Sequence, residues 1–277
     1  NSTSYLNPAP LNTVFSLQTT ITNLTAVSSS SANWGNFDND GDLDLIITGN
    51  SVSTGRISKI YSKNNGVNSF TEMSAFGITP VSSGSTAWGD FNNDGYLDLL
   101  ISGEAGSGKI SKIFKNDAGT GFSEQTGINI IPLGSSSASW GDYDNDGDLD
   151  LLITGLSVSN SRTTKLYRNN GDNTFTEQTR SILTGVASGS VSWGDCDNDG
   201  DLDLIMTGLD LSSTRTTKLY RNDNGLFTDV PTSIPGVYYS SVAWCDFDRD
   251  GYLDLLITGR ASSGLIARIY RNDADLH

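Results

Sequence analysis

Aspartate-rich loops are the part of this sequence whose residue types and spacing could do chemistry. The segment WGDYDNDGDLDLLITG at 140–155 places five aspartates at alternate positions and continues at once into an apolar run. Carboxylates this close together would repel one another strongly if nothing positive lay among them. The segment therefore predicts a site for a metal ion.

The same loop occurs five times, and its positions are counted from the second residue after a tryptophan. Position 6 is always glycine, which permits the sharp turn that gathers the other side chains around one centre. Position 7 tolerates tyrosine, so we expect it to offer its backbone carbonyl. In the third loop we expect Asp142, Asp144, Asp146 and Asp150 to point at one ion and Asp148 to point away.

Positions 1, 3, 5 and 9 carry a side-chain oxygen in every loop, and these residues with position 7 are the expected ligands. They are Asn36, Asp38, Asp40, Asp42 and Asp44; Asp90, Asn92, Asp94, Tyr96 and Asp98; Asp142, Asp144, Asp146, Asp148 and Asp150; Asp195, Asp197, Asp199, Asp201 and Asp203; and Asp246, Asp248, Asp250, Tyr252 and Asp254. The glycines are Gly41, Gly95, Gly147, Gly200 and Gly251. Five solvated acidic turns would need the same spacing to arise five times by coincidence.

Oxygen ligands without nearby histidine or cysteine favour calcium, because magnesium resists dehydration and prefers a tight octahedron. We expect about five calcium ions, one for each loop, which would change the formal net charge from −15 to −5. The first two loops should bind more weakly, since Asn36 and Asn92 each replace a carboxylate. An EF-hand is excluded because apolar residues such as Ile153 stand at position 12, where that motif has glutamate.

The elements that must position these loops recur with a period of about fifty residues. The tryptophans lie 51 to 54 residues apart, at Trp34, Trp88, Trp140, Trp193 and Trp244. Each repeat contains a Ser/Gly-rich segment ending in the tryptophan, the acidic loop, an apolar segment such as LDLLITG, a basic-aromatic segment such as TKLYRNN and a Phe-led segment such as FTEQ. Four short strands in a repeated unit predict the blades of an all-β propeller, with the Ser/Gly-rich strand innermost.

The ends of the chain predict how such a ring would close. A Phe-led segment follows each of the first four repeats, at Phe70, Phe122, Phe175 and Phe227, whereas a matching segment, VFSLQTTI at 14–21, precedes the first repeat. We therefore expect residues 1–277 to form one domain of five four-stranded blades, with residues 14–21 as the closing strand of the last blade. The alternative is that the chain is part of a larger propeller.

Composition and charge exclude several functions. A net charge of −15 argues against nucleic acid as a partner, and no apolar run approaches the ~20 residues needed to span a bilayer. The only histidine is His277, so a histidine-based catalytic site is implausible. Outside the loops, Glu72, Glu124, Glu177 and Asp229 recur at one repeat position, which predicts an exposed outer-strand role. We therefore expect a protein that is not an enzyme.

Two further features leave alternatives open. Cys196 and Cys245, the only cysteines, stand near equivalent points of neighbouring repeats, and they could form a disulfide or remain two small buried thiols. The connections between the second and third strands, and those before the inner strands, vary most between repeats, and one of them (PGVYY) presents Tyr238 and Tyr239. Such variation is expected of recognition loops on a rigid scaffold. It is equally expected of loops whose sequence merely tolerates change.

The recurring pattern W-G-D-x-D-x-D-G-x-L-D-L-x-x-x-G followed by Y-R-N-D/N-G resembles the FG-GAP/VCBS repeat family of calcium-loop β-propellers, and the resemblance covers nearly the whole chain. It implies calcium on one face and ligand recognition by loops on the other face or between blades. We therefore expect a secreted or cell-surface, lectin-like or adhesion module that binds carbohydrate or an extracellular protein. The alternative is a self-assembling structural subunit of an extracellular filament or surface assembly.

Overall fold

The protein is built from antiparallel β-strands. The computed structural model describes residues 21, 23–63 and 69–273, and this part contains nineteen strands and one short 3-10 helix, η1 (Ser74–Phe76). Within these residues no helix has the length and apolar character needed to cross a membrane. The all-β fold expected from the short alternating segments is confirmed.

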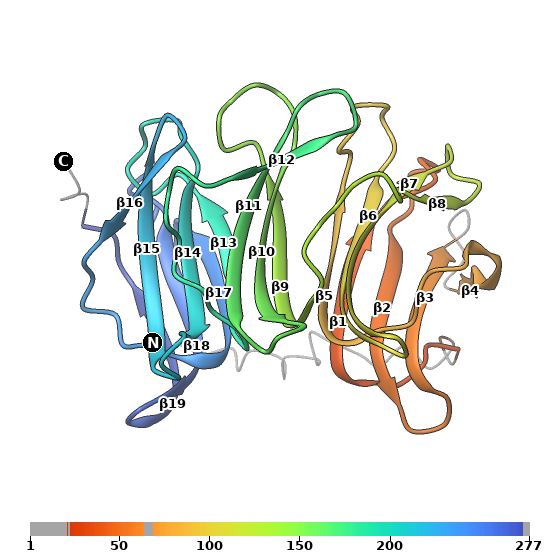
Figure 1. Cartoon of the computed structure of the whole chain (residues 1–277), viewed down its shortest axis with the longest axis horizontal. Helices are drawn as coiled ribbons and strands as arrows, with labels where there is room; N and C mark the ends of the chain where they lie inside the picture. The colour runs from red at the N-terminus through yellow and green to blue at the C-terminus, as the bar shows by residue number, and fades with distance from the viewer. Residues whose placement is uncertain (1–20, 22, 64–68, 274–277) are drawn as a thin grey trace, which may run out of the picture.

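The strands form five units that follow one another in chain order (Figure 1). The first unit contains β1 (Ser28–Gly35), β2 (Asp44–Ser51), β3 (Gly55–Lys63) and β4 (Phe70–Glu72), and the second β5 (Ser82–Gly89), β6 (Asp98–Ala105), β7 (Gly108–Asn116) and β8 (Phe122–Glu124). The third contains β9 (Leu133–Gly141), β10 (Asp150–Ser157), β11 (Arg162–Asn169) and β12 (Phe175–Gln178). The fourth contains β13 (Val191–Gly194), β14 (Asp203–Leu209), β15 (Arg215–Asp223) and β16 (Leu226–Val230), and the fifth β17 (Tyr238–Cys245), β18 (Asp254–Ala261) and β19 (Gly264–Tyr270). One pairing, Ile110 with Leu133, joins the second and third units into an eight-stranded sheet.

Four strands per repeat are confirmed in the first four units. The fifth unit has three strands among the described residues, and the predicted closing strand at 14–21 lies outside the described residues apart from Ile21. The second strand of each unit is the most apolar, and Leu99, Leu100 and Ile101 of β6 are fully buried. The second strand of each of the first four units therefore lies in a sheet whose two faces are covered, whereas Leu256 of β18 is 42% exposed.

Neighbouring units pack through a contact between a tryptophan and a glycine. Trp88, Trp140, Trp193 and Trp244 each lie against the glycine that follows the tryptophan of the preceding unit, namely Gly35, Gly89, Gly141 and Gly194. A Cβ atom at any of these glycines would stand 2.6–2.8 Å from the indole Cδ1 atom, closer than carbon atoms can approach. The repeated Trp-Gly dipeptide is thus a packing requirement, because each glycine makes room for the next unit's tryptophan.

The first strands of all five units begin around one hollow. Its volume is about 460 Å³, and every unit contributes a lining residue that has left-handed backbone angles, with φ between 45° and 56°: Ser29, Ser83, Ser135, Ser188 and Tyr239. Register shifts in β1, β5 and β17 fall at these positions, where an extra residue is accommodated. The Ser/Gly-rich segments are thus the innermost strands of a propeller-like array, as the sequence predicts.

Candidate metal centre

The acidic loops connect the first strand of each unit to the second, and three of them gather three carboxylates. In each group one oxygen from position 1, one from position 3 and one from position 5 lie within 4.8 Å of one another. The groups are Asp142, Asp144 and Asp146; Asp195, Asp197 and Asp199; and Asp246, Asp248 and Asp250. In the first two loops Asn36 and Asn92 take one of these positions, so each has two carboxylates and an amide there.

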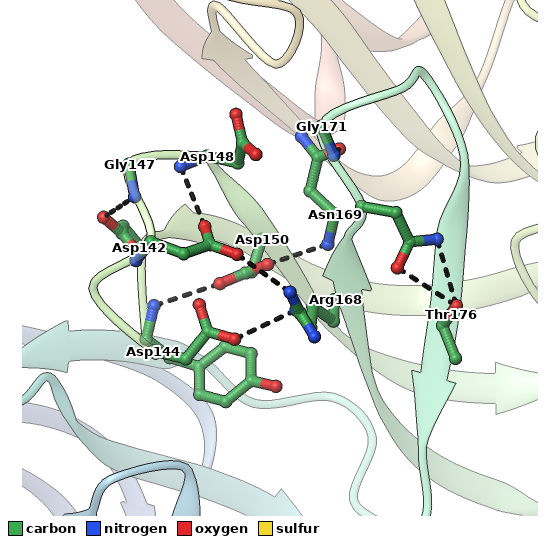
Figure 2. A network of polar contacts seen from close by, with 12 residues as sticks. Asp142, Asp144, Gly147, Asp148, Asp150, Arg168, Asn169, Gly171 and Thr176 are labelled. Carbon is green, nitrogen blue, oxygen red and sulfur yellow. Dashed lines mark hydrogen bonds and ion pairs between the residues drawn. The ribbon is translucent and has the colours of Figure 1, made fainter.

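Backbone hydrogen bonds fold each loop around this group. In the third loop the N–H groups of Asp146 and Gly147 donate to the Asp142 carboxylate, and the N–H of Asp148 donates to Asp146 Oδ1 (Figure 2). Gly147 has a φ of 91°, a conformation that glycine adopts without strain, and the other four position-6 glycines have φ between 88° and 94°. The glycine therefore performs the turning role expected from the sequence.

Unpaired oxygens support the fit of this donor set to a hard cation. Among the described residues, Oδ1 of Asn36 and Oδ1 of Asp144 are buried without a hydrogen-bond partner. A buried oxygen without a partner costs free energy, and a cation would supply the missing interaction. Carboxylate and amide oxygens, with no nitrogen or sulfur ligand, are the donors that calcium prefers. The residues present therefore fit calcium, which stays a prediction here.

The aspartate at position 9 has a structural role that sequence reasoning missed. Asp150 is fully buried, its Oδ2 accepts from the backbone N–H of Tyr143 at 3.1 Å, and its Oδ1 accepts from that of Asn169 at 2.8 Å. The same pair of contacts is made by Asp44, Asp98, Asp203 and Asp254. This carboxylate ties the loop to the end of the third strand. The signal in the sequence is that position 9 is aspartate in all five loops, whereas positions 1 and 3 admit asparagine.

Burial makes the position-9 carboxylates of the first four loops hard to ionise in the metal-free protein. The pKa values of Asp98 and Asp150 are raised to about 7 and that of Asp44 to about 6, by burial first and also by neighbouring aspartates, while two N–H donors act in the opposite sense. A carboxyl with a raised pKa prefers its neutral form, and a nearby cation would favour the charged form instead.

The side chain at position 7 turns toward the neighbouring unit. Asp148 points away from the three-carboxylate group, as the sequence predicts (Figure 2). Its carboxylate accepts a hydrogen bond of 2.7 Å from Asn93 Nδ2 in the preceding loop. Asp201 accepts in the same way from Asn145 Nδ2. These contacts join consecutive loops, and they leave the backbone carbonyl as the only group that position 7 could offer to an ion.

A basic side chain from the third strand, or from the residue that follows it, lies over each of several loops. Arg168 of β11 places Nε 3.1 Å from Asp144 Oδ2 and Nη2 3.2 Å from Asp146 Oδ2 (Figure 2). Lys115 contacts Asp94 at 3.2 Å, and Arg271 lies 3.8 Å from Asp248. The sequence motif contains these residues, but their approach to the acidic loop was not predicted. They supply positive charge to the same carboxylates that would bind calcium.

We expect Arg168→Gln to increase the calcium affinity of the third loop several-fold, because the guanidinium competes for Asp144 and Asp146. In the calcium-free protein the same change should cost at most about 1 kcal/mol, since the ion pair is half exposed. Titration calorimetry and denaturant melts in chelator measure the two effects. Arg162→Gln, at the other end of β11, is the control for the change in net charge. An unchanged or weakened third site would contradict competition.

The remaining predicted residues lie as follows. Cys196 is a buried free thiol and Cys245 an exposed one, so no disulfide joins them and the expectation of two buried thiols is wrong for Cys245. Cys245 occupies the place of the glycine that receives the next unit's tryptophan, and no described unit follows it. The recurring outer-strand acids each pair with a third-strand lysine: Lys59 with Glu72, Lys112 with Glu124, Lys165 with Glu177 and Lys218 with Asp229.

Comparison with known protein families identifies the repeat. A family model described as an FG-GAP-like repeat matches residues 36–101, 90–153, 156–206 and 208–257, which together are most of the chain. The protein belongs to the FG-GAP-like repeat family. The resemblance read from the Trp-to-Gly motif is thereby confirmed. A comparison with curated protein sequences found no significant match.

Solved structures with a similar fold include two that this chain matches over most of its length. One is an Agrocybe aegerita lectin, described by its specific recognition of non-reducing terminal N-acetylglucosamine, with a TM-score of 0.55 and 15% identity, covering 90% of this chain and 67% of that chain. The other is YjhT, with a TM-score of 0.54 and 12% identity, covering 84% of this chain and 72% of that chain. At these identities the similarity concerns the fold.

Proposed function

We propose that the protein is an extracellular, calcium-stabilised propeller of five blades that binds carbohydrate on the face opposite its acidic loops. The first strand of every unit ends at its acidic loop, so the beginnings of these strands lie on the opposite face. The hollow at these strand beginnings offers a concave polar site of the size that small ligands occupy. The acidic loops serve as the scaffold's metal sites in this proposal, and the hollow serves as the recognition site.

An aromatic pair beside the hollow, of which Tyr239 is exposed and Tyr238 half-buried, is the observation that carries the proposal. Tyr239 lines the hollow, is 74% exposed and has a φ of 45°, which is a strained conformation for a bulky residue. Its ring centroid lies 4.7 Å from that of Tyr238, and Arg215 stands 5.3 Å from the Tyr238 ring centroid. A large apolar ring held open to solvent at a structural cost favours a role in recognition.

The chemistry of this face suits a sugar. A pyranose presents hydroxyl groups at its edge and C–H bonds on its face. Serine hydroxyls can donate and accept hydrogen bonds, and every unit lines the hollow with at least one serine, including Ser240 beside Tyr239 in the last unit. A tyrosine ring can pack against the C–H face. The fold shared with the Agrocybe aegerita lectin, which recognises terminal N-acetylglucosamine, is consistent with this ligand class.

We expect Tyr239→Ala to weaken glycan binding at least about tenfold, because it removes the aromatic platform. A glycan array on the calcium-loaded protein identifies the sugar, and titration calorimetry measures the loss. Tyr239→Phe should retain most of the binding. Leu226→Ala, at an exposed residue that begins β16 on the face of the acidic loops, should leave it unchanged.

Absence of any glycan binding by the folded, calcium-loaded protein would overturn the proposal. If the protein instead formed ordered polymers without a small ligand, the role of a structural subunit in an extracellular assembly would be favoured. Retention of full affinity by Tyr239→Ala would move the sugar site away from the hollow.

A further inference from the structure

Position 4 of the acidic loops carries a side chain that is not among the expected metal ligands. It lies between ligand positions 3 and 5 and is occupied by Asn39, Asn93, Asn145, Asn198 and Arg249. All five residues have left-handed backbone angles, with φ between 56° and 64°, and asparagine adopts this conformation more readily than most residues. The side chain at position 4 is therefore attached to the loop at a well-defined point between two expected ligands.

Each of the four asparagines donates a hydrogen bond to the acidic loop of the next unit. The acceptor is in every case the backbone carbonyl of the position-6 glycine. The Nδ2–O distances are 2.8 Å from Asn39 to Gly95, 3.4 Å from Asn93 to Gly147, 3.2 Å from Asn145 to Gly200 and 2.9 Å from Asn198 to Gly251. In the third and fourth loops the position-7 carboxylate is a second acceptor, at 2.7 Å and 2.9 Å. The same contact thus joins all consecutive loops.

The accepting peptide group belongs to the framework of the next metal site. Its carbonyl is that of position 6 and its N–H is that of position 7, and this N–H donates to the position-5 carboxylate, as from Asp148 to Asp146 Oδ1 at 3.0 Å. Because a peptide group is planar, holding both of its ends fixes its plane. The position-7 carbonyl, an expected ligand, comes next in the chain. Asn93 therefore helps to orient both the Asp146 carboxylate and the Asp148 carbonyl.

The conformation at position 4 depends in turn on its own loop. The N–H of Asp94 donates to Oδ1 of Asp90 and to Oδ1 of Asn92, both at 3.0 Å. The peptide group between positions 4 and 5 is therefore held by the side chains at positions 1 and 3. An ion that gathers these side-chain oxygens would order the same peptide group. Order in the second loop is linked in this way, through Asn93, to order in the third.

A buried asparagine holds the two units in a fixed relative position. Asn169, fully buried at the end of β11, donates from Nδ2 to the Phe91 carbonyl of the preceding loop at 2.7 Å and from its backbone N–H to Asp150 at 2.8 Å. Asn116 and Asn222 make the equivalent contacts at their own junctions. Because the units are joined in this way, a change in one loop reaches the next loop instead of being absorbed by movement between units.

We propose that the position-4 asparagines are positioning residues that couple neighbouring calcium sites, so that calcium in one loop raises the affinity of the loops beside it. The inference rests on the calcium sites of the proposed function. The coupling is reciprocal, because a site that strengthens its neighbour is strengthened by it to the same extent. Repulsion between bound ions acts in the opposite sense and is screened at physiological salt. The second, third and fourth loops, which are joined by two contacts at each junction, should be coupled most strongly.

A thermodynamic cycle on the second and third loops tests the coupling. Asp94→Ala should disable the second site and weaken the third about fivefold or more, although the third site remains in the stoichiometry. Asn93→Gly should weaken the third site by itself, and adding Asp94→Ala to it should weaken that site no further. Glycine is the appropriate replacement because it keeps left-handed backbone angles without strain and removes only the amide donor.

Two measurements report on the third loop separately from the others. The Gly147 amide, which donates to Asp142, gives a resonance that follows occupancy of the third site when calcium buffered by a chelator is titrated at physiological salt. In the metal-free protein, Asn93→Gly should speed hydrogen exchange of the Asp148 amide several-fold, because the plane of that peptide group is no longer held from both ends. The second measurement is independent of calcium.

Asn160→Gly is the matched control. Asn160 also has a left-handed φ, of 57°, and its Oδ1 accepts from Lys109 Nζ at 2.8 Å, so it too joins the second and third units. It lies in the connection between β10 and β11, at the opposite end of the strands from the acidic loops. Its replacement should leave both the Asp148 exchange rate and the effect of Asp94→Ala on the third site unchanged.

Calcium binding at the third site that is equal with and without Asp94→Ala would overturn the coupling and leave the calcium sites themselves in place. Full retention of the coupling in Asn93→Gly, or its equal loss in Asn160→Gly, would overturn the role of Asn93. A folded protein that binds no calcium at all would overturn the coupling together with the calcium sites of the proposed function.

Discussion

Removal of calcium by EGTA is expected to lower Tm by at least about 10 °C. Each site that is occupied at a hundredfold excess over its Kd stabilises the folded protein by about 2.7 kcal/mol, and in a chain of this size 1 kcal/mol corresponds to roughly 2–4 °C. Three of the loops hold three carboxylate oxygens within 4.8 Å, so the metal-free loops also retain mutual repulsion. Differential scanning calorimetry of the same sample before and after chelation measures the change.

Two controls separate specific binding from general screening of charge. Sodium chloride at matched ionic strength should restore little of the lost stability, and magnesium should restore less than calcium, because the loops offer a flexible all-oxygen site. Asp146→Ala should remove one calcium from the stoichiometry and leave the remaining sites, since the loops lie in different units. An unchanged melt of protein shown to be metal-free would refute the calcium prediction.

The second large effect is expected from Asp150→Ala, which should lower the free energy of unfolding by about 2–6 kcal/mol even in chelator. The Asp150 carboxylate accepts from two buried N–H groups, on Tyr143 and Asn169, and each donor left without a partner costs about 1–3 kcal/mol. Denaturant unfolding in the presence of EGTA measures this structural role apart from any loss of metal.

Asp148→Ala is the matched control, because it removes a carboxylate from the same loop whose contact with Asn93 is at the surface. It should cost less than about 1 kcal/mol and retain the backbone carbonyl that we expect to face calcium. Equal effects of the two substitutions would mean that position 9 has no special structural role and that Asp150 acts only through the charge of the loop.

The sequence alone determined the features that depend on local spacing. The repeat length, the strand pattern and the family follow from segments that recur along the chain. The gathering of positions 1, 3 and 5 also follows, because a glycine turn brings together residues that are only two to four positions apart. The outward direction of Asp148 could be predicted for the same reason, since position 7 admits tyrosine in other repeats.

Only the tertiary structure decided the features that join distant residues. Asp150 meets the N–H of Asn169, and Arg168 reaches Asp144 and Asp146, because the third strand returns beside the loop some twenty residues later. The hollow near Tyr239 arises between whole units about fifty residues apart in the chain. Spacing along one repeat cannot encode these contacts, because they depend on how sheets pack against one another rather than on which residues are neighbours in sequence.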